Sequence, residues 1–442
     1  MKKKPIGLVL LLLFSSFLPA QSLFEDAEAS HKKEENPYEL NGYLRSVLFI
    51  GKVPNVEEAE LKSGYGEAAL KLKVRKQSFG DAFAEIRFRR GYEFKKSVSE
   101  INLREAYLNV YAGPFDFRIG HQIVVWGRAD GLNPTDNITP KNLLVRSPDE
   151  DDRRQANFLI RSTYNHYPLR LEAIWVPAYE SSYVPIDLIP FPPGVMLIGP
   201  DYPDARIMNS AFAFRLNWEK PSFDGSLSYF NGHNPFPGIS ANILILAPNN
   251  LFIEAFPKSY RLHILGADFQ TTAGPYGLRG ELAYRRPHQD HQRFIHIPNP
   301  DLYYIFGIDK EFSGDLNVIL QYIGRHVFDF MELERPINPL DIPSYELAQK
   351  NRMIASQQDR LSHSLSFRIE KKLLHETMSV EVLGLIHITS DEFLLRPMLT
   401  YDIADALNVT VGGEVFAGQK NTLFDTIDST LNSVFLELRA SF

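Results

Sequence analysis

From Leu40 to the last residue, apolar and polar side chains alternate in segments of about ten residues. Residues 67–75 show this most clearly, because every second side chain is apolar and the others, apart from Ala69, are charged. The same alternation recurs in residues 84–89, 212–218, 278–285 and 407–415. Since a β-strand places successive side chains on opposite faces, each segment predicts a strand with one apolar and one polar face.

These segments predict about 18 strands, with cores that span the length of a tilted membrane strand. The cores are residues 41–50, 65–75, 82–92, 101–111, 115–126, 155–164, 169–176, 209–218, 223–231, 260–270, 276–286, 302–310, 315–325, 361–369, 378–388, 393–401, 407–416 and 432–442.

The connections fall alternately into a short class and a mostly long class, with short exceptions near 93–100 and 389–392. The short connections are 76–81, 112–114, 165–168, 219–222, 271–275, 311–314, 370–377 and 402–406, and the long ones are 51–64, 127–154, 177–208, 232–259, 287–301 and 326–360. A soluble β-sandwich also alternates, but it has no reason to sort its loops by length. We therefore predict that residues 39–442 form an all-β fold, a single closed antiparallel transmembrane β-barrel with short periplasmic turns and long outer loops.

Both ends of the chain agree with a barrel of the outer membrane. Lys2, Lys3 and Lys4 precede an apolar run at residues 6–18 and small or polar residues at 19–22, which predicts a signal peptide over residues 1–22. Residues 23–38 are mostly polar and predict a short periplasmic segment. The last strand ends on Phe442, and a closing amphipathic strand with a terminal aromatic residue resembles the signal that the barrel-assembly machinery recognises.

Composition narrows the function further. The chain has 442 residues, no cysteine and a net charge of −7, and no basic stripe indicates a nucleic-acid partner. The motifs of serine hydrolases and of zinc proteases are missing. We expect neither an enzyme nor a bound cofactor or metal.

Residues of one parity along the predicted strands should face the barrel lumen. The basic residues in this group include Lys71, Lys73, Arg75, Arg87, Arg89, Arg118, Arg161, Arg215 and Arg279. The first five form a basic stripe on two neighbouring strands, which would favour anions in a pore. In the alternative, acids such as Glu67, Glu85 and Glu105 pair with them across the strands as structural ladders.

Residues 120–136 contain the most distinctive motif, W-G-x-x-D-x-x-N-P-x-D beginning at Trp126. Here the chain resembles broad, mostly uncharacterised outer-membrane barrel families that are allied to alginate-export porins. The resemblance implies a single-chain barrel whose polar lumen is crossed by polysaccharide or another small solute. Arg128, Asp130, Asn133 and Asp136 are candidates for an inward-folded constriction; alternatively, they only cap a loop at the barrel rim.

Other outer loops have unusual compositions. The acidic run at residues 149–152 predicts a solvated loop, with a divalent-ion bridge to lipopolysaccharide as the alternative. Residues 183–200 and 238–256 are rich in apolar residues and proline, which predicts a lid over the barrel mouth.

Three functions remain. The first is a porin-like channel of the outer membrane for small polar or anionic solutes, including saccharides, with the lipid bilayer, lipopolysaccharide and the assembly machinery as partners. The second is a surface-exposed binding protein or adhesin on a plugged barrel. The third is a transporter of hydrophobic compounds that enter through the apolar loops.

Overall fold

The structure, a computed structural model, describes residues 37–52, 58–76, 79–94, 96–184, 195–247 and 250–442. The predicted signal peptide and all but the last residues of the predicted periplasmic segment lie outside these residues.

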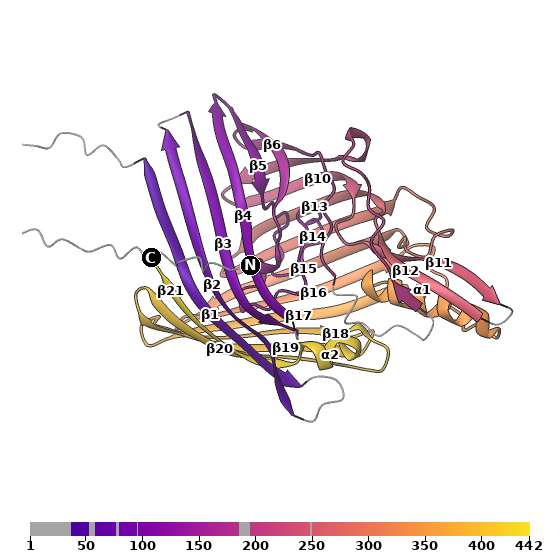
Figure 1. Cartoon of the computed structure of the whole chain (residues 1–442). Helices are drawn as coiled ribbons and strands as arrows, with labels where there is room; N and C mark the ends of the chain where they lie inside the picture. The colour runs from indigo at the N-terminus through magenta and orange to yellow at the C-terminus, as the bar shows by residue number, and fades with distance from the viewer. Residues whose placement is uncertain (1–36, 53–57, 77–78, 95, 185–194, 248–249) are drawn as a thin grey trace, which may run out of the picture. The chain divides into compact units, whose positions relative to one another are not determined.

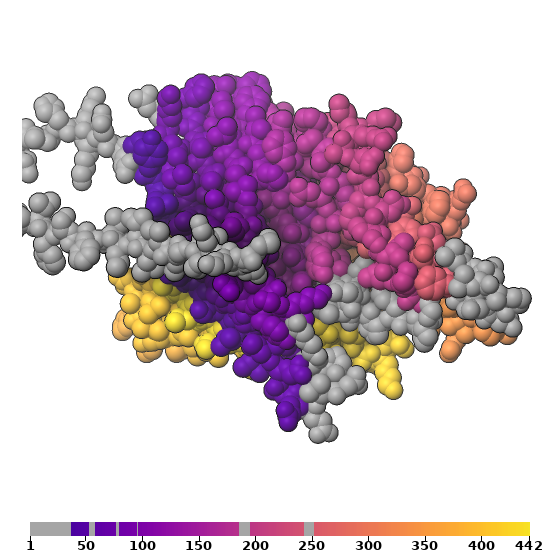
Figure 2. Space-filling model, in the orientation of Figure 1, coloured from indigo at the N-terminus to yellow at the C-terminus, as the bar shows by residue number. Residues whose placement is uncertain are grey.

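Eighteen strands form one antiparallel sheet that closes on itself (Figure 1). They are β1 (Tyr38–Lys52), β2 (Ala59–Lys76), β3 (Gly80–Glu93), β4 (Lys96–Ala112), β5 (Phe115–Gln122), β6 (Asn157–His166), β7 (Leu169–Val176), β9 (Ala211–Lys220), β10 (Phe223–His233), β13 (Arg261–Ala273), β14 (Tyr276–Pro287), β15 (Asp301–Phe312), β16 (Leu316–Val327), β17 (Leu361–Leu373), β18 (Met378–His387), β19 (Glu392–Ala404), β20 (Leu407–Gly418) and β21 (Ser433–Ser441). Each strand pairs with the next, and β21 pairs with β1 from Tyr43–Ser441 to Ile50–Val434. The predicted closed barrel and its strand count are confirmed. In the space-filling view the first strands, in indigo, lie against the last, in yellow (Figure 2).

The predicted faces of the strands are also confirmed. On β2, Leu70 and Leu72 are 44% and 42% exposed, whereas Glu67 is only 4% exposed. On β21, Leu436 and Leu438 face outward while Phe435 and Glu437 are buried. A closed sheet satisfies its backbone groups internally, so the apolar face can contact lipid while the polar face lines the lumen.

Short turns occupy the barrel end at which β1 begins and β21 ends. The turn between β4 and β5 is closed by Gly113, whose φ of 61° is costly for other residues. Because short turns mark the periplasmic side of such barrels, Phe442 lies at this rim. The Phe442 N–H donates to the Gly42 carbonyl at 3.0 Å, and the Gly42 N–H donates to the Phe442 carbonyl at 2.9 Å.

Deleting Phe442 is expected to lower the amount of folded barrel in the membrane without altering transport by the barrels that form. The deletion removes the two hydrogen bonds between Phe442 and Gly42, and it removes an aromatic ring on the outer face. The measurement is the fraction of heat-modifiable protein in isolated membranes. Phe442→Ala keeps the backbone bonds and Phe442→Tyr keeps the ring, so the two variants separate these contributions. Normal folded levels after deletion would contradict the prediction.

At the opposite end, the long connections contain strands and helices that the alternating sequence pattern did not predict. A second, three-stranded sheet consists of β8 (Val195–Leu197), β11 (Gly238–Ala247) and β12 (Asn250–Lys258). The helices α1 (Ile342–Ile354) and α2 (Leu423–Leu431) lie in two other connections. The prediction of a loop at 238–256 is therefore wrong in detail, because these residues form a hairpin that packs against α1 through Ile239, Ala255 and Leu347. Within the described residues, no helix is long and apolar enough to cross a membrane.

Candidate functional site

Residues 123–156, which we call the lumen segment, connect β5 to β6 by crossing the inside of the barrel. The strand predicted to reach residue 126 ends at Gln122. Trp126 is 3% exposed, and its indole N–H donates to Glu172 on β7 at 2.8 Å. Gly127 has a φ of 103°, and a Cβ there would lie 2.5 Å from a carboxylate oxygen of Glu281. The inward turn therefore requires glycine at this position.

One part of the lumen segment is fixed to the wall formed by β10, β13 and β14. The guanidinium of Arg128 pairs with Asp224 at 2.7 Å and with Asp268 at 2.5 Å. The Glu281 carboxylate accepts hydrogen bonds from the backbone N–H groups of Arg128 (3.0 Å), Ala129 (3.2 Å) and Thr135 (2.8 Å). It also accepts from the Thr135 hydroxyl at 2.8 Å. A single buried carboxylate thus organises the turn.

The other candidate residues of the motif divide into two roles. Asp130 pairs with Arg368 on β17 at 2.8 Å, and its backbone exchanges hydrogen bonds with Gln321 on β16. The Asn133 amide donates to Glu281 at 3.3 Å. Asp136 instead pairs with Arg154 of the same segment at 2.6 Å. Arg128, Asp130 and Asn133 therefore contact the walls, while Asp136 holds the segment together.

The far part of the lumen segment is fixed to the wall on which the barrel closes. Asp152 lies between Arg45 on β1, at 2.7 Å, and Arg87 on β3, at 2.6 Å. Arg146 pairs with Glu414 on β20 and is almost completely buried. Burial by itself would raise the pKa of Asp152, but the two guanidinium groups hold that pKa well below its usual range. The prediction that residues 149–152 form a solvated loop is wrong for Asp152, which is 8% exposed.

The basic stripe is divided in the structure. Arg87 pairs with Glu85 at 2.7 Å, and Arg89 pairs with Glu67 at 2.8 Å. Arg89 is buried and Arg87 is largely buried, and the Arg89–Glu67 pair runs across neighbouring strands as the alternative of structural ladders describes. Lys71 is 37% exposed in its side chain and lies 3.7 Å from Glu85. Arg75 is 60% exposed in its side chain and lies 3.4 Å from Glu39. Lys73 is half-buried on the same inward face of β2.

Four further arginines predicted to face the lumen have polar partners. Arg118 donates to Asn109 at 2.7 Å, Arg161 pairs with Glu172, Arg215 pairs with Asp268 at 2.8 Å, and Arg279 pairs with Asp309. Arg279 also donates to the Arg128 carbonyl at 3.3 Å. The lumen arginines therefore act mainly by holding the walls and the lumen segment in place.

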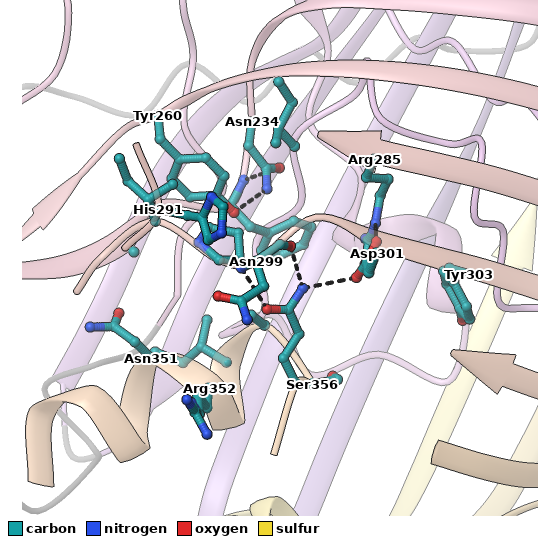
Figure 3. A pocket seen from close by; sticks show the side chains of 18 of the residues that line it. Asn234, Tyr260, Arg285, His291, Asn299, Asp301, Tyr303, Asn351, Arg352 and Ser356 are labelled. Carbon is teal, nitrogen blue, oxygen red and sulfur yellow. Dashed lines mark hydrogen bonds and ion pairs between the residues drawn. The ribbon is translucent and has the colours of Figure 1, made fainter. Parts of the chain in front are cut away.

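A cavity of about 380 Å³ lies between the lumen segment and the outer loops (Figure 3). Residues 131–139 form one side, and α1 contributes Asn351 and Arg352. At its base Asp301 pairs with Arg285 through a 2.7 Å hydrogen bond from Nε, and it lies 3.5 Å from Arg325. Two guanidinium groups thus share one carboxylate, which leaves an excess of positive charge.

Two polar groups of the cavity that lie outside the strands, Tyr260 and His296, are neutral at neutral pH. Burial raises the pKa of Tyr260 to about 12. Burial lowers the pKa of His296 to about 4. The fixed charges come from Arg285, Arg325, Arg352 and Lys141 on one side and from Asp136, Asp301 and Asp329 on the other, while Tyr260 and His296 supply neutral hydrogen-bonding groups.

Several residues of this site were not candidates from the sequence. The sequence did not single out Arg45 or Arg146, and it placed Asp152 only in an acidic run, because the ion-pair partners of all three lie far away in the chain. The inward parity of Glu281 was predictable, but its role as acceptor for three backbone N–H groups was not. Among the described residues, no group of three or more histidine, aspartate or glutamate side chains is placed to hold a metal ion.

Solved structures show where this fold occurs. OccAB4 of Acinetobacter baumannii superposes with a TM-score of 0.54 at 10% identity, covering 92% of this chain and 99% of the other. OccAB1 of the same organism gives 0.54 at 8% identity, covering 95% and 98%. OpdK of Pseudomonas aeruginosa, solved with vanillate, gives 0.53 at 8% identity, covering 92% and 98%. These likenesses support a porin-like barrel fold and not the alginate-export resemblance. No protein-family model and no curated protein matches the sequence.

Proposed function

We propose that the protein is a channel of the outer membrane for small polar solutes, with a preference for organic anions. The observation that carries the proposal is the lumen segment, which charged groups fix to opposite walls inside a closed barrel. Such a segment narrows the lumen to a path lined by polar side chains. The proposal includes export by the predicted signal peptide, insertion by the barrel-assembly machinery and an outer half surrounded by lipopolysaccharide.

The cavity supports the preference for anions. Arg285 and Arg325 share Asp301, so a solute carboxylate could balance the remaining charge. Tyr260 and Tyr303 border the same space and suit an aromatic ring or a sugar. One solved structure of the same fold, OpdK, contains vanillate, an aromatic carboxylate. An aromatic carboxylate is therefore the first solute to test.

The test is planar-bilayer recording with the purified full chain. We expect ohmic current steps that benzoate reduces in a concentration-dependent way, whereas benzyl alcohol, its neutral analogue, has little effect. A neutral disaccharide forms the third arm, and block by it in place of benzoate would change the substrate class to saccharides. Electrical silence of folded protein would contradict the channel and favour the plugged binding protein.

A further inference from the structure

The outward face of β13 and β14 carries a cluster of two arginines and two histidines at the outer rim. Arg261 and His263 lie on β13, and Arg286 lies on β14 directly across from His263. His288 follows β14, and its backbone N–H donates to the Arg261 carbonyl at 2.9 Å. We call these four residues the rim patch.

The rim patch faces the membrane side of the barrel and not the lumen. Leu265 and Tyr284 are the next outward pair toward the periplasm, and Leu265 is 57% exposed. The inward positions beside it, Leu262 and Ile264, are buried. The patch therefore sits one side-chain pair beyond the lipid-facing apolar surface, where lipid headgroups begin.

The hydrogen-bond partners of Arg261 in the rim patch are all neutral groups. Arg261 donates to the Asn231 side chain at 2.7 Å and to the carbonyls of Met208 and Ser210 at 3.0 Å each. Two carboxylates in the adjoining loops have other partners. Asp204 pairs with Arg206 at 2.9 Å, and Asp290 accepts a hydrogen bond from the Gln292 N–H at 3.0 Å. Within the described residues, neither Arg261 nor Arg286 forms an ion pair, so the charge remains uncompensated.

The histidines extend the patch as a hydrogen-bonded chain. Tyr229 lies 2.8 Å from Nδ1 of His263, and Nε2 of His263 lies 3.2 Å from Nδ1 of His288. With Tyr229 donating to His263, and His263 to His288, the Nε2–H of the exposed His288 is directed onward as a donor. Two guanidinium groups and this donor match the oxygens of a phosphate.

Apolar side chains border the patch. Ile207 and Met208 are 80% and 87% exposed, and Met208 belongs to the short segment whose carbonyls anchor Arg261. Two strongly exposed apolar residues beside a basic cluster fit a surface that contacts acyl chains next to a headgroup.

We propose that the rim patch is a binding site for the phosphate of a lipid headgroup in the outer leaflet. The proposal requires only that the barrel folds, so the result of its test does not depend on the proposed channel function. It also differs from the bridge through residues 149–152 considered in the sequence, because Asp152 lies inside the barrel.

Native mass spectrometry of the full chain in detergent tests the site with three probes: dioleoyl phosphatidic acid, dioleoyl phosphatidylcholine and inorganic phosphate. We expect wild-type protein to retain phosphatidic acid in preference to phosphatidylcholine. Arg286→Gln should weaken retention about fivefold and the Arg261→Gln, Arg286→Gln double variant about thirtyfold, since each cation at a membrane surface contributes a similar increment. The matched control is Arg90→Gln, because Arg90 is an exposed outward arginine one side-chain pair beyond Phe88 on β3.

Heat modifiability establishes that each variant is folded. Arg286→Gln removes no intramolecular ion pair among the described residues, so it keeps the test valid if loss of Arg261 disturbs folding. Unchanged retention by folded Arg286→Gln, equal loss in Arg90→Gln, or equal retention of the two lipids would overturn the proposal. Displacement of the lipid by millimolar inorganic phosphate would assign the patch to a free anion instead of a lipid.

Discussion

Glu281→Ala is expected to give larger and noisier single-channel currents than the wild type. The substitution leaves three backbone N–H groups of the lumen segment without their acceptor, at 2.8 to 3.2 Å in the intact protein. Leaving these donors unsatisfied costs on the order of 3 kcal/mol or more, which is enough to release the turn at Gly127 from the wall. The lumen then widens and the freed segment fluctuates in the current path.

The matched control is Glu311→Ala. Glu311 has the same inward parity on β15 as Asp301, but it is exposed near the periplasmic end. Both substitutions remove one carboxylate from the inner face of the barrel, but only Glu281→Ala releases the lumen segment. A normal conductance and noise level in folded Glu281→Ala would show that the lumen segment is not the constriction.

Asp152→Asn is expected to shift the reversal potential in a salt gradient toward anions and to lower barrel stability. The change removes the carboxylate that lies within 2.7 Å of Arg45 and Arg87 and keeps the size of the side chain. Breaking a buried ion pair by neutralising one partner costs about 3–5 kcal/mol. The substitution makes the net charge of this part of the lumen more positive by one, which favours anions there.

Asp151→Asn is the control for this substitution, because the side chain of the neighbouring Asp151 is 75% exposed and, among the described residues, forms an ion pair only with Arg154. We expect little change in either measurement for that variant. Acid titration supplies a second check. The pKa of Asp152 is depressed, so its stabilising contribution is complete above the usual carboxyl pKa near 4 and is lost only as the pH falls below it. Wild-type selectivity should therefore not change through titration of Asp152 between about pH 5 and pH 7. An unchanged reversal potential in conducting Asp152→Asn would exclude Asp152 as a determinant of selectivity.

The division of the basic stripe changes where selectivity should be sought. Arg87 and Arg89 are buried in pairs with Glu85 and Glu67, so they cannot act as free charges toward a passing solute. Lys71 remains partly exposed and loosely paired, at 3.7 Å from Glu85. Parity along a strand predicts that a side chain enters the lumen. Pairing there depends on the lumen segment as well as on neighbouring strands.

The sequence by itself determined the closed barrel, a count of about 18 strands and the faces of the alternating side chains along them. These features follow from local rules, because an alternating strand in lipid has one stable orientation and its backbone needs a partner strand. The tertiary structure alone decided that residues 123–156 cross the lumen, that Asp152 is buried between Arg45 and Arg87, and that Arg261 and Arg286 share one rim. It also decided that residues 238–258 form a hairpin, because the apolar composition of this segment does not specify which residues pair. Such contacts join residues far apart in the chain, and their geometry depends on barrel closure, which no local pattern encodes.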